Sequence, residues 1–484
     1  MKGRWPLVLA WLLPLLVYAL SARRDVWFWD TGEMDTVPWI LGIAHPTGFP
    51  AYVVSGFVFS HVLPFGSVAL RMSLMSALAM SGAAWFVARC VDDEADNPWI
   101  AAGCAWIFAF GSIAWTRGAR AEVHALAAFT IAATIFFALR WYRTEQRRDF
   151  YLASLAWGVG LAVHPVVVLL LPGLLLLFVA RLYALQGWEP AVAMLLALAA
   201  AAIWYPYLPL RSAYVTAHAL DPTRSLGLPI GGAFWDYDHP ASWRGFVALA
   251  GGGDFDVSGG FHALFSRSTY GTGLAAYAVQ FVNEFTPFGT IVAAAGVVTG
   301  ALRDRIRTIA LVLFGIACIP FGIGFPPESD PNRYFLTSFI VAAIFIGEAA
   351  AWLAQRLPRA RVLPAVILAG IACALLVENR WIFTEAADAS ARALISGVQH
   401  ATPGNAVLVA NWEDAPPLAY AAYVEHSLDR RIVEAAWLSD VADQVPRWAA
   451  TRPVFAIGEP PDEVPGYRLA AVRSQALIYR LVPR

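Results

Sequence analysis

The sequence contains little charge: only 14% of its 484 residues are Asp, Glu, Lys or Arg, whereas 59% are hydrophobic. A soluble domain typically has about 25% charged residues, so this composition excludes an ordinary water-soluble protein and indicates that most of the chain lies in lipid. The formal net charge of -1 argues against a nucleic-acid partner, because binding to nucleic acid requires a concentrated basic surface.

Cysteine is also scarce. The four cysteines, Cys90, Cys104, Cys318 and Cys373, lie in or beside apolar segments and not in the polar loops. This placement supports neither a disulfide framework nor a cysteine metal cluster. The chain shows no internal repeat, and its last hundred residues contain neither a Gly-rich phosphate loop nor a nucleophile motif.

Long apolar runs are abundant. A segment must contain about 20 residues to cross the hydrocarbon core of a bilayer as a helix. Eleven segments are predicted to do so: 5–21, 68–88, 98–115, 121–141, 150–165, 166–183, 189–209, 275–300, 307–325, 334–355 and 362–378. The segment 50–66 is also apolar, but it is short and contains Pro50, His61 and Pro64.

The arginines indicate how segment 50–66 lies. If it crossed the membrane, the arginine-rich run 140–148 would fall outside. If it lies along the outer surface, the basic loops collect in the cytoplasm, as the positive-inside rule expects. We therefore expect a multi-pass protein of a bacterial inner membrane, with the N-terminus inside and the C-terminus outside. Residues 5–21 are expected to stay as the first span rather than to be removed as a signal peptide.

This orientation gathers the polar loops on the periplasmic face. They are 22–67, 116–122, the His164-Pro165 junction, 210–274 and 324–335. Loops far apart in the sequence would thereby meet over one external cavity.

The first of these loops, WFWDTGEMDTVPWILGIAHPTGFP (27–50), is dense in acids, aromatics and turn residues. Asp30 and Glu33 are three residues apart and would share a helix face. A carboxylate in an apolar aromatic pocket has a raised proton affinity and can act as a general base. The turn HPTGFP would hold His45 over the same cavity. A carboxylate pair also suits a divalent metal, although no second cluster has ligand spacing. The alternative is an interfacial aromatic belt with its acids in water.

The other outer loops supply cations and further polar residues. Arginine suits bidentate recognition of phosphate, so these loops are expected to bind a lipid with a phosphate headgroup. The alternative for each arginine is snorkelling to the membrane surface. In the long loop, Trp235 and Asp236 are typical of a carbohydrate contact. The candidate substrate-binding residues are His45, Arg117, Arg120, Glu122, His124, His164, Arg211, Trp235, Asp236 and Arg333.

From about residue 379 the composition changes. Short apolar runs at 405–411, 430–437, 453–458 and 476–482 alternate with helical patterns that carry charge. Such alternation predicts a small α/β domain over 379–484, either for acceptor recognition or as a structural cap.

Several motifs resemble the GT-C superfamily of integral-membrane glycosyltransferases, and most closely its transmembrane protein O-mannosyltransferase branch. They are DTGE (30–33), LGIAHPTGFP (41–50), Arg71, AEVH (121–124), GLAVH (160–164), LPLRS (208–212) and the Trp235-Asp236 region. The resemblance implies a mainly α bundle of about eleven spans over 1–378, with surface-lying helices in the first external loop. It implies sugar transfer from a polyprenyl-phosphate donor to an acceptor outside the cytoplasm, with Asp30 as base and Glu33 assisting.

The leading hypothesis is therefore an inverting lipid-linked-sugar glycosyltransferase whose acceptor is a protein, lipid or glycan hydroxyl. It requires no nucleotide site. The alternative is a transporter or flippase of lipid-linked glycans, which predicts charges or broken helices at mid-membrane in paired repeats. A non-catalytic scaffold would not need Asp30, Glu33 and His45 together.

Overall fold

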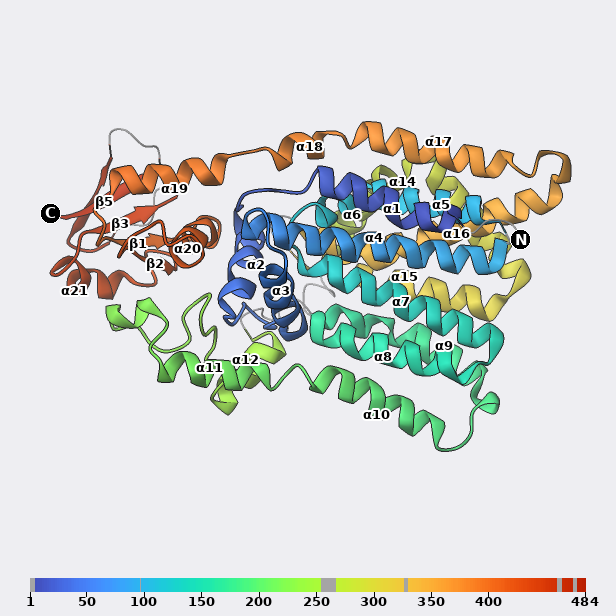
Figure 1. The fold of residues 1–484 in the computed structure, drawn as a ribbon, viewed down its shortest axis with the longest axis horizontal. Helices are drawn as coiled ribbons and strands as arrows, with labels where there is room; N and C mark the ends of the chain where they lie inside the picture. The colour runs from blue at the N-terminus through green and yellow to red at the C-terminus, as the bar shows by residue number, and fades with distance from the viewer. Residues whose placement is uncertain (1–4, 96, 254–266, 326–329, 459–463, 473–476) are drawn as a thin grey trace.

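Long helices run side by side and form the larger part of the molecule, and a small sheet domain lies beyond one end of them (Figure 1). The computed structural model describes residues 5–95, 97–253, 267–325, 330–458, 464–472 and 477–484. The predicted mainly α membrane bundle with a small C-terminal α/β domain is confirmed.

The helices and strands follow the predicted order along the chain. The α-helices up to residue 251 are α1 (Trp5–Leu20), α2 (Trp29–Ile40), α3 (Pro50–Val62), α4 (Val68–Ala95), α5 (Pro98–Phe110), α6 (Ser112–Gly118), α7 (Val123–Thr144), α8 (Arg147–Val163), α9 (Leu171–Ala180), α10 (Glu189–Ala202), α11 (Tyr207–Ala217) and α12 (Trp243–Gly251). The later ones are α14 (Arg267–Arg303), α15 (Arg305–Ile323), α16 (Leu336–Arg356), α17 (Leu363–Glu378), α18 (Trp381–Ala386), α19 (Ser390–Ala401), α20 (Ala415–Tyr423) and α21 (Val445–Ala449). Short 3-10 helices are η1 (Pro165–Leu170), η2 (Leu182–Ala184), η3 (Pro222–Leu226), η5 (Pro331–Phe335), η6 (Pro358–Ala360) and η7 (Ala442–Gln444).

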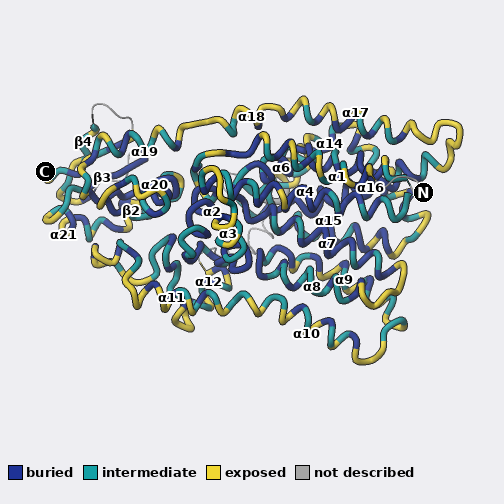
Figure 2. Tube along the Cα trace, viewed as in Figure 1, coloured by how far each residue is buried: buried dark blue, intermediate teal, exposed yellow. Residues whose placement is uncertain are grey.

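Most of the apolar stretch of each of the central helices α4, α7 and α16 is buried, as expected for helices in the middle of a bundle. Figure 2 shows that the middle of the bundle is buried, whereas α10 and α17 at its edges are more exposed. Each of the eleven predicted spans coincides with helical structure. Among the described residues, six helices are long and apolar enough to cross a membrane alone, or eight if each bent pair forms one span. The protein is thus a multi-pass membrane protein.

Two sequence expectations need correction. The predicted span 98–115 is not one straight helix, because α5 and α6 meet at Gly111 with a bend of 75°. The region 210–274 is not a simple loop, since it contains the end of α11 as well as η3, α12 and the start of α14; residues 254–266 lie outside the described part.

Glu284 on α14 stabilises the break between α5 and α6. Its carboxylate accepts hydrogen bonds from the Ser112 hydroxyl at 2.5 Å and from the Ile113 amide at 2.8 Å. A Cβ at position 111 would lie 2.1 Å from a Glu284 oxygen, so only glycine fits this close approach. The redirected helix α6 carries Arg117 in its last turn.

The helices α2 and α3 lie at the end of the bundle that faces the sheet domain (Figure 1). Their buried apolar residues form one cluster with residues of the C-terminal domain; it includes Met34, Val37, Tyr52, Leu408, Leu418 and Tyr420. The two parts of the chain therefore share a hydrophobic core at this junction. Most of the segment 50–66 forms α3 (Pro50–Val62), which is among the shorter apolar helices.

The C-terminal sheet has the strand order β2-β1-β3-β5-β4. Strand β1 (Val407–Ala410) is parallel to β2 (Ile432–Ala435) and β3 (Val454–Ile457), whereas β5 (Ile478–Pro483) is antiparallel to β3 and to β4 (Tyr467–Ala471). The four predicted strands correspond to β1, β2, β3 and β5. Strand β4 was not predicted because it is a half-exposed edge strand without a continuous apolar run.

Gly32, in the DTGE motif, lies at a close contact between α2 and α20. A Cβ there would lie 2.2 Å from the Trp27 carbonyl oxygen and 2.9 Å from the Pro416 Cβ. We expect Gly32→Ala to lower the free energy of unfolding by about 1–3 kcal/mol, because overpacking forces the backbone apart. Thermal unfolding of the detergent-solubilised protein measures this loss.

Gly370→Ala is the matched control, since Gly370 is also helical and a Cβ there would meet no atom within 4 Å. It should be neutral or slightly stabilising, because alanine is the better helix former. Equal behaviour of the two variants would contradict the close packing of α20 on α2.

Candidate functional site

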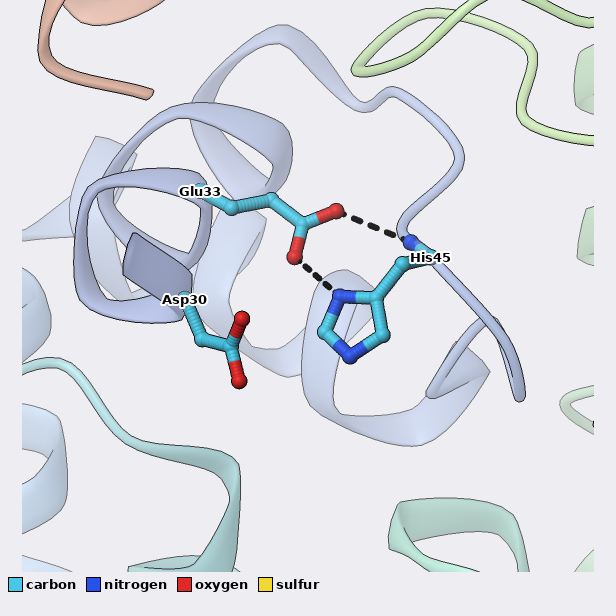
Figure 3. A group of neighbouring side chains, drawn as sticks. All are labelled: Asp30, Glu33 and His45. Carbon is cyan, nitrogen blue, oxygen red and sulfur yellow. Dashed lines mark hydrogen bonds and ion pairs between the residues drawn. The ribbon is translucent and has the colours of Figure 1, made fainter. Parts of the chain in front are cut away.

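Asp30, Glu33 and His45 come together at the end of the bundle, as the sequence predicts (Figure 3). Asp30 lies in the first turn of α2, where the helix dipole favours a carboxylate, and Glu33 follows one turn later. Glu33 accepts a hydrogen bond from the His45 backbone amide at 2.8 Å, and its second oxygen contacts the His45 Nδ1. Glu33 therefore fixes the turn that carries His45, while one ligand atom from each of the three residues lies within 4.8 Å of the others.

Asp30 has a cation and an indole as partners. Arg333 Nη1 donates to its Oδ2 at 2.7 Å, and Trp412 Nε1 donates to its Oδ1 at 2.9 Å. Burial alone would raise the pKa of Asp30, but the charges of Arg333 and His45 and these two hydrogen bonds lower it below its ordinary value. The expected raised proton affinity of Asp30 is therefore wrong, and the side chain is an ionised carboxylate at neutral pH.

The carboxyl group of α2 that has a raised pKa is that of Asp35, not that of Asp30. Asp35 is buried, and burial raises the pKa of this carboxyl well above its ordinary value. For His45, burial alone would lower the pKa, but the carboxylates of Glu33 and Asp30 outweigh that effect and raise it. The site thus holds an ionised Asp30 beside an imidazole that readily carries a proton.

The short helix η5 connects the Asp30 site to a second cluster of charged side chains, around Arg117. Asp330 directly precedes η5 and pairs with Arg117, and it also accepts from Arg120 at 3.3 Å. Glu122 accepts from Arg117 at 3.2 Å. Since Arg333 lies three residues after Asp330, η5 links this network to Asp30. The predicted gathering of Arg117, Arg120, Glu122 and Arg333 is therefore observed.

His124 and His164 lie beside that network. The Nδ1 of His124 is 2.8 Å from a Glu122 oxygen, and its ring centroid is 4.6 Å from that of His164. Tyr334 of η5 contacts the His124 ring edge-on, with centroids 5.2 Å apart, and Phe49 stacks on His164. These rings form a cluster next to the charged group.

Three candidates do not join this group through any described contact. Arg211 donates to the backbone carbonyls of Leu41 and Ile40 at 2.5 and 2.9 Å, so it satisfies the C-terminal end of α2. Asp236 is buried and lies 2.8 Å from the His239 Nδ1. Trp235 packs edge-on against Tyr423 of the C-terminal domain. Asp236 is thus buried and Trp235 partly buried, and their role as a sugar contact stays a prediction.

Sequence reasoning missed Trp412 and Asp330. Trp412 follows β1, and loops at the carboxyl ends of parallel strands commonly form sites, but no local pattern distinguishes it among the 20 tryptophans. Asp330 stands in DPNRY beside the predicted Arg333. Its position next to an arginine was the only available signal.

The three residues of Figure 3 have ligand types that a divalent cation accepts. In this structure, however, the Asp30 oxygens are engaged by Arg333 and Trp412, and Glu33 is engaged by His45. The carboxylates are therefore already paired with protein donors. A cation bound at Asp30 would compete with Arg333 for the carboxylate.

Comparison with known proteins supports the resemblance. Residues 30–187 match the family model of the protein O-mannosyl-transferase TMEM260 N-terminal domain. The protein O-mannosyl-transferase tmem260 of Dictyostelium discoideum is 27% identical over 183 residues, or 34% of this chain and 22% of that protein. The mouse TMEM260 protein is 28% identical over 208 residues, or 40% of this chain and 29% of that protein. The matched part thus spans less than a third of each relative, and the motifs at 208–212 and 235–236 lie outside the family-model match.

Solved structures resemble the whole chain. ArnT from Cupriavidus metallidurans bound to undecaprenyl phosphate has a TM-score of 0.57 at 12% identity, covering 99% of this chain and 98% of that one. An oligosaccharyltransferase from Archaeoglobus fulgidus has a TM-score of 0.53 at 12% identity, covering 93% of this chain and 68% of that one. The chain therefore has the fold of the GT-C membrane glycosyltransferases, and its residues 30–187 resemble the N-terminal domain of the TMEM260 protein O-mannosyltransferases.

Proposed function

We propose that this protein is a glycosyltransferase that moves a sugar from a polyprenyl-phosphate donor to an acceptor hydroxyl outside the cytoplasm. The observation that carries the proposal is the pair of Asp30 and Arg333, which places an ionised carboxylate 2.7 Å from a guanidinium at the end of the bundle. A base for a hydroxyl and a cation for a phosphate are the two groups that this transfer needs. The bound undecaprenyl phosphate of the similar ArnT structure supports the class of donor.

In the proposed reaction, the acceptor oxygen attacks the anomeric carbon on the face opposite to the lipid phosphate. A bond forms between these two atoms while the bond from the anomeric carbon to the phosphate oxygen breaks. The acceptor proton passes to Asp30, and the bonding electron pair leaves with the phosphate, whose charge Arg333 neutralises. This is a single displacement and inverts the anomeric configuration.

The surrounding residues support these roles. Arg117 is buried, with Glu122 and Asp330 as counter-charges, so it holds η5 and hence Arg333 in place. Glu33 holds His45 beside Asp30. A positioned carboxylate that transfers a proton contributes roughly 10²–10⁴-fold to a rate. Because the named relatives are protein O-mannosyl-transferases, mannose and a protein hydroxyl are the first substrates to test; lipid and glycan acceptors are the next.

The site lies at the end of the bundle that bears the sheet domain (Figure 1). The arginines of 140–148 must stay in the cytoplasm under the positive-inside rule. We therefore expect that α3 does not cross the membrane and that the C-terminus is outside. A reporter that is active only outside the cytoplasm should be active after residue 484, and the same reporter placed after residue 145 should be silent. The opposite pattern would contradict the proposed orientation.

Asp30→Asn tests the proposed base. The amide has nearly the same size but cannot take a proton, so transfer should fall by about 10²–10⁴-fold while donor binding survives. Purified protein, a polyprenyl-phosphate mannose and a Ser/Thr peptide provide the assay, with mass spectrometry of the product. Glu33→Gln should cost less, because its amide oxygen still accepts from the His45 backbone. An Asp30→Asn protein that transfers sugar at the parental rate would refute this mechanism.

Arg333 and Arg211 allow a comparison of two arginines at the same end of the protein. Arg333→Ala should raise the donor KM by about 10- to 100-fold, the effect of losing a charge-assisted contact worth about 1.5–3 kcal/mol. Arg211→Ala should instead mainly lower the thermal stability, because Arg211 binds the last carbonyls of α2. Donor KM and unfolding temperature, measured for both variants, separate the two effects. An unchanged donor KM in Arg333→Ala would leave it only the role of a counter-charge.

A further inference from the structure

The C-terminal sheet domain reaches into the site through Trp412. This residue follows β1, in the loop that leads to α20. Its Nε1 donates to Asp30 Oδ1 at 2.9 Å, while Arg333 occupies Oδ2. The two oxygens of one carboxylate are therefore held by donors from different parts of the chain, 382 and 303 residues away in sequence.

The indole is itself held from several sides. It stacks on Phe234, with ring centroids 5.7 Å apart and an interplanar angle of 5°. The rings of His45 and Tyr237 meet it edge-on, at 5.8 and 6.3 Å. The neighbouring Glu413 carbonyl accepts from the Trp29 amide at 3.2 Å, which joins the loop to the start of α2. The contacts with these three rings, together with this backbone hydrogen bond, fix the direction of the Trp412 indole N–H.

We propose that Trp412 is a positioning residue for Asp30, so that the C-terminal sheet domain completes the transfer site. The inference rests on the proposed function, because it assigns Asp30 the role of base. A base must stand within hydrogen-bond distance of the proton that it removes, in a fixed orientation. Arg333 is shared between the carboxylate and the donor phosphate in that mechanism, whereas Trp412 has no such second role. Trp412 is thus the partner that holds the carboxylate throughout the reaction.

The hydrogen bond from Trp412 to Asp30 also affects how the transfer activity depends on pH. Within the described residues, the titratable and charged groups that face Asp30 are Glu33 of α2, His45 of the following loop, and Arg333 and Tyr334 of η5. Glu122, before α7, acts in turn on Arg333. Hydrogen bonding from Trp412 is one of the causes that lower the pKa of Asp30. Removing it raises this pKa, and since the base must be deprotonated, activity is then lost at a higher pH as the solution is acidified.

The test compares Trp412→Phe with Trp412→Tyr in the full-length protein, using the polyprenyl-phosphate mannose and peptide assay. Phenylalanine keeps an aromatic ring but has no donor, and tyrosine differs from it by one hydroxyl. We expect kcat to fall about 10- to 100-fold in Trp412→Phe, with the donor KM unchanged. The acid limb of the pH–kcat profile should move to higher pH, and Trp412→Tyr should recover part of kcat.

Trp448→Phe is the matched control. Trp448 belongs to the same domain and is buried, and its indole donates to the Leu226 carbonyl at 2.9 Å, far from any contact with Asp30. This variant loses a comparable hydrogen bond, so it should show a similar change in thermal stability but the parental kcat and pH profile. It separates a local effect on Asp30 from a general weakening of the domain.

The outcomes distinguish this inference from the proposed function. If Asp30→Asn is inactive but Trp412→Phe keeps the parental kcat and acid limb, Trp412 does not position Asp30 and the proposed function stands. Equal losses in Trp412→Phe and Trp412→Tyr, or an equal loss in Trp448→Phe, overturn the role of the hydrogen bond. If Asp30→Asn transfers sugar normally, the mechanism itself fails, whatever the Trp412 variants do.

Discussion

The ion pair between Asp30 and Arg333 is the interaction on which the arrangement of the site depends. It joins the first turn of α2 to η5, and both side chains are largely withdrawn from water, at 25% and 15% exposure. A partly buried charge is costly without its partner, so each of these segments is stable in this position only when the other is present. Opposite charges are also paired in the neighbouring network, because Arg117 contacts both Asp330 and Glu122. The network thus fixes three segments that the backbone connects only distantly.

The apolar junction between the bundle and the sheet domain brings the Trp412 loop to Asp30, as the ion pairs bring η5 to it. Because α2 packs on α20 and shares a core cluster with β1, the loop after β1 comes to the start of α2. Gly32 makes this approach feasible, since any side chain at that position would strike the Trp27 carbonyl or Pro416. The second glycine-dependent contact, Gly111 against Glu284, redirects α6 so that Arg117 reaches Glu122 and Asp330. Packing at a distance from the reacting atoms therefore decides where the charged groups lie.

Sequence patterns predicted those features of the structure that depend on residues close together in the chain. Apolar run length predicted the long helices, and short apolar runs predicted four of the five strands in the described part of the chain. The spacing of Asp30, Glu33 and the HPTGFP turn was sufficient to group Asp30, Glu33 and His45. The pKa of Asp30 could not be predicted in this way, because aromatic neighbours are visible in the adjacent sequence but its counter-charge and its indole donor are hundreds of residues away. For the same reason an isolated arginine such as Arg211 could not be distinguished from a phosphate ligand before its carbonyl partners were known.

A lowered pKa at Asp30 raises the question of how such a weak base takes a proton from a hydroxyl. The answer under the proposed function lies in the shared arginine. Arg333 neutralises Asp30 at 2.7 Å, but as the bond to the sugar breaks, negative charge grows on the phosphate oxygen and draws the same guanidinium toward it. Asp30 then loses part of the stabilisation that lowered its pKa, while the attacking hydroxyl becomes more acidic as its oxygen bonds to carbon. The Asp30 carboxylate therefore stays deprotonated before the reaction, which keeps it active. It becomes a stronger base only during the step in which the proton moves.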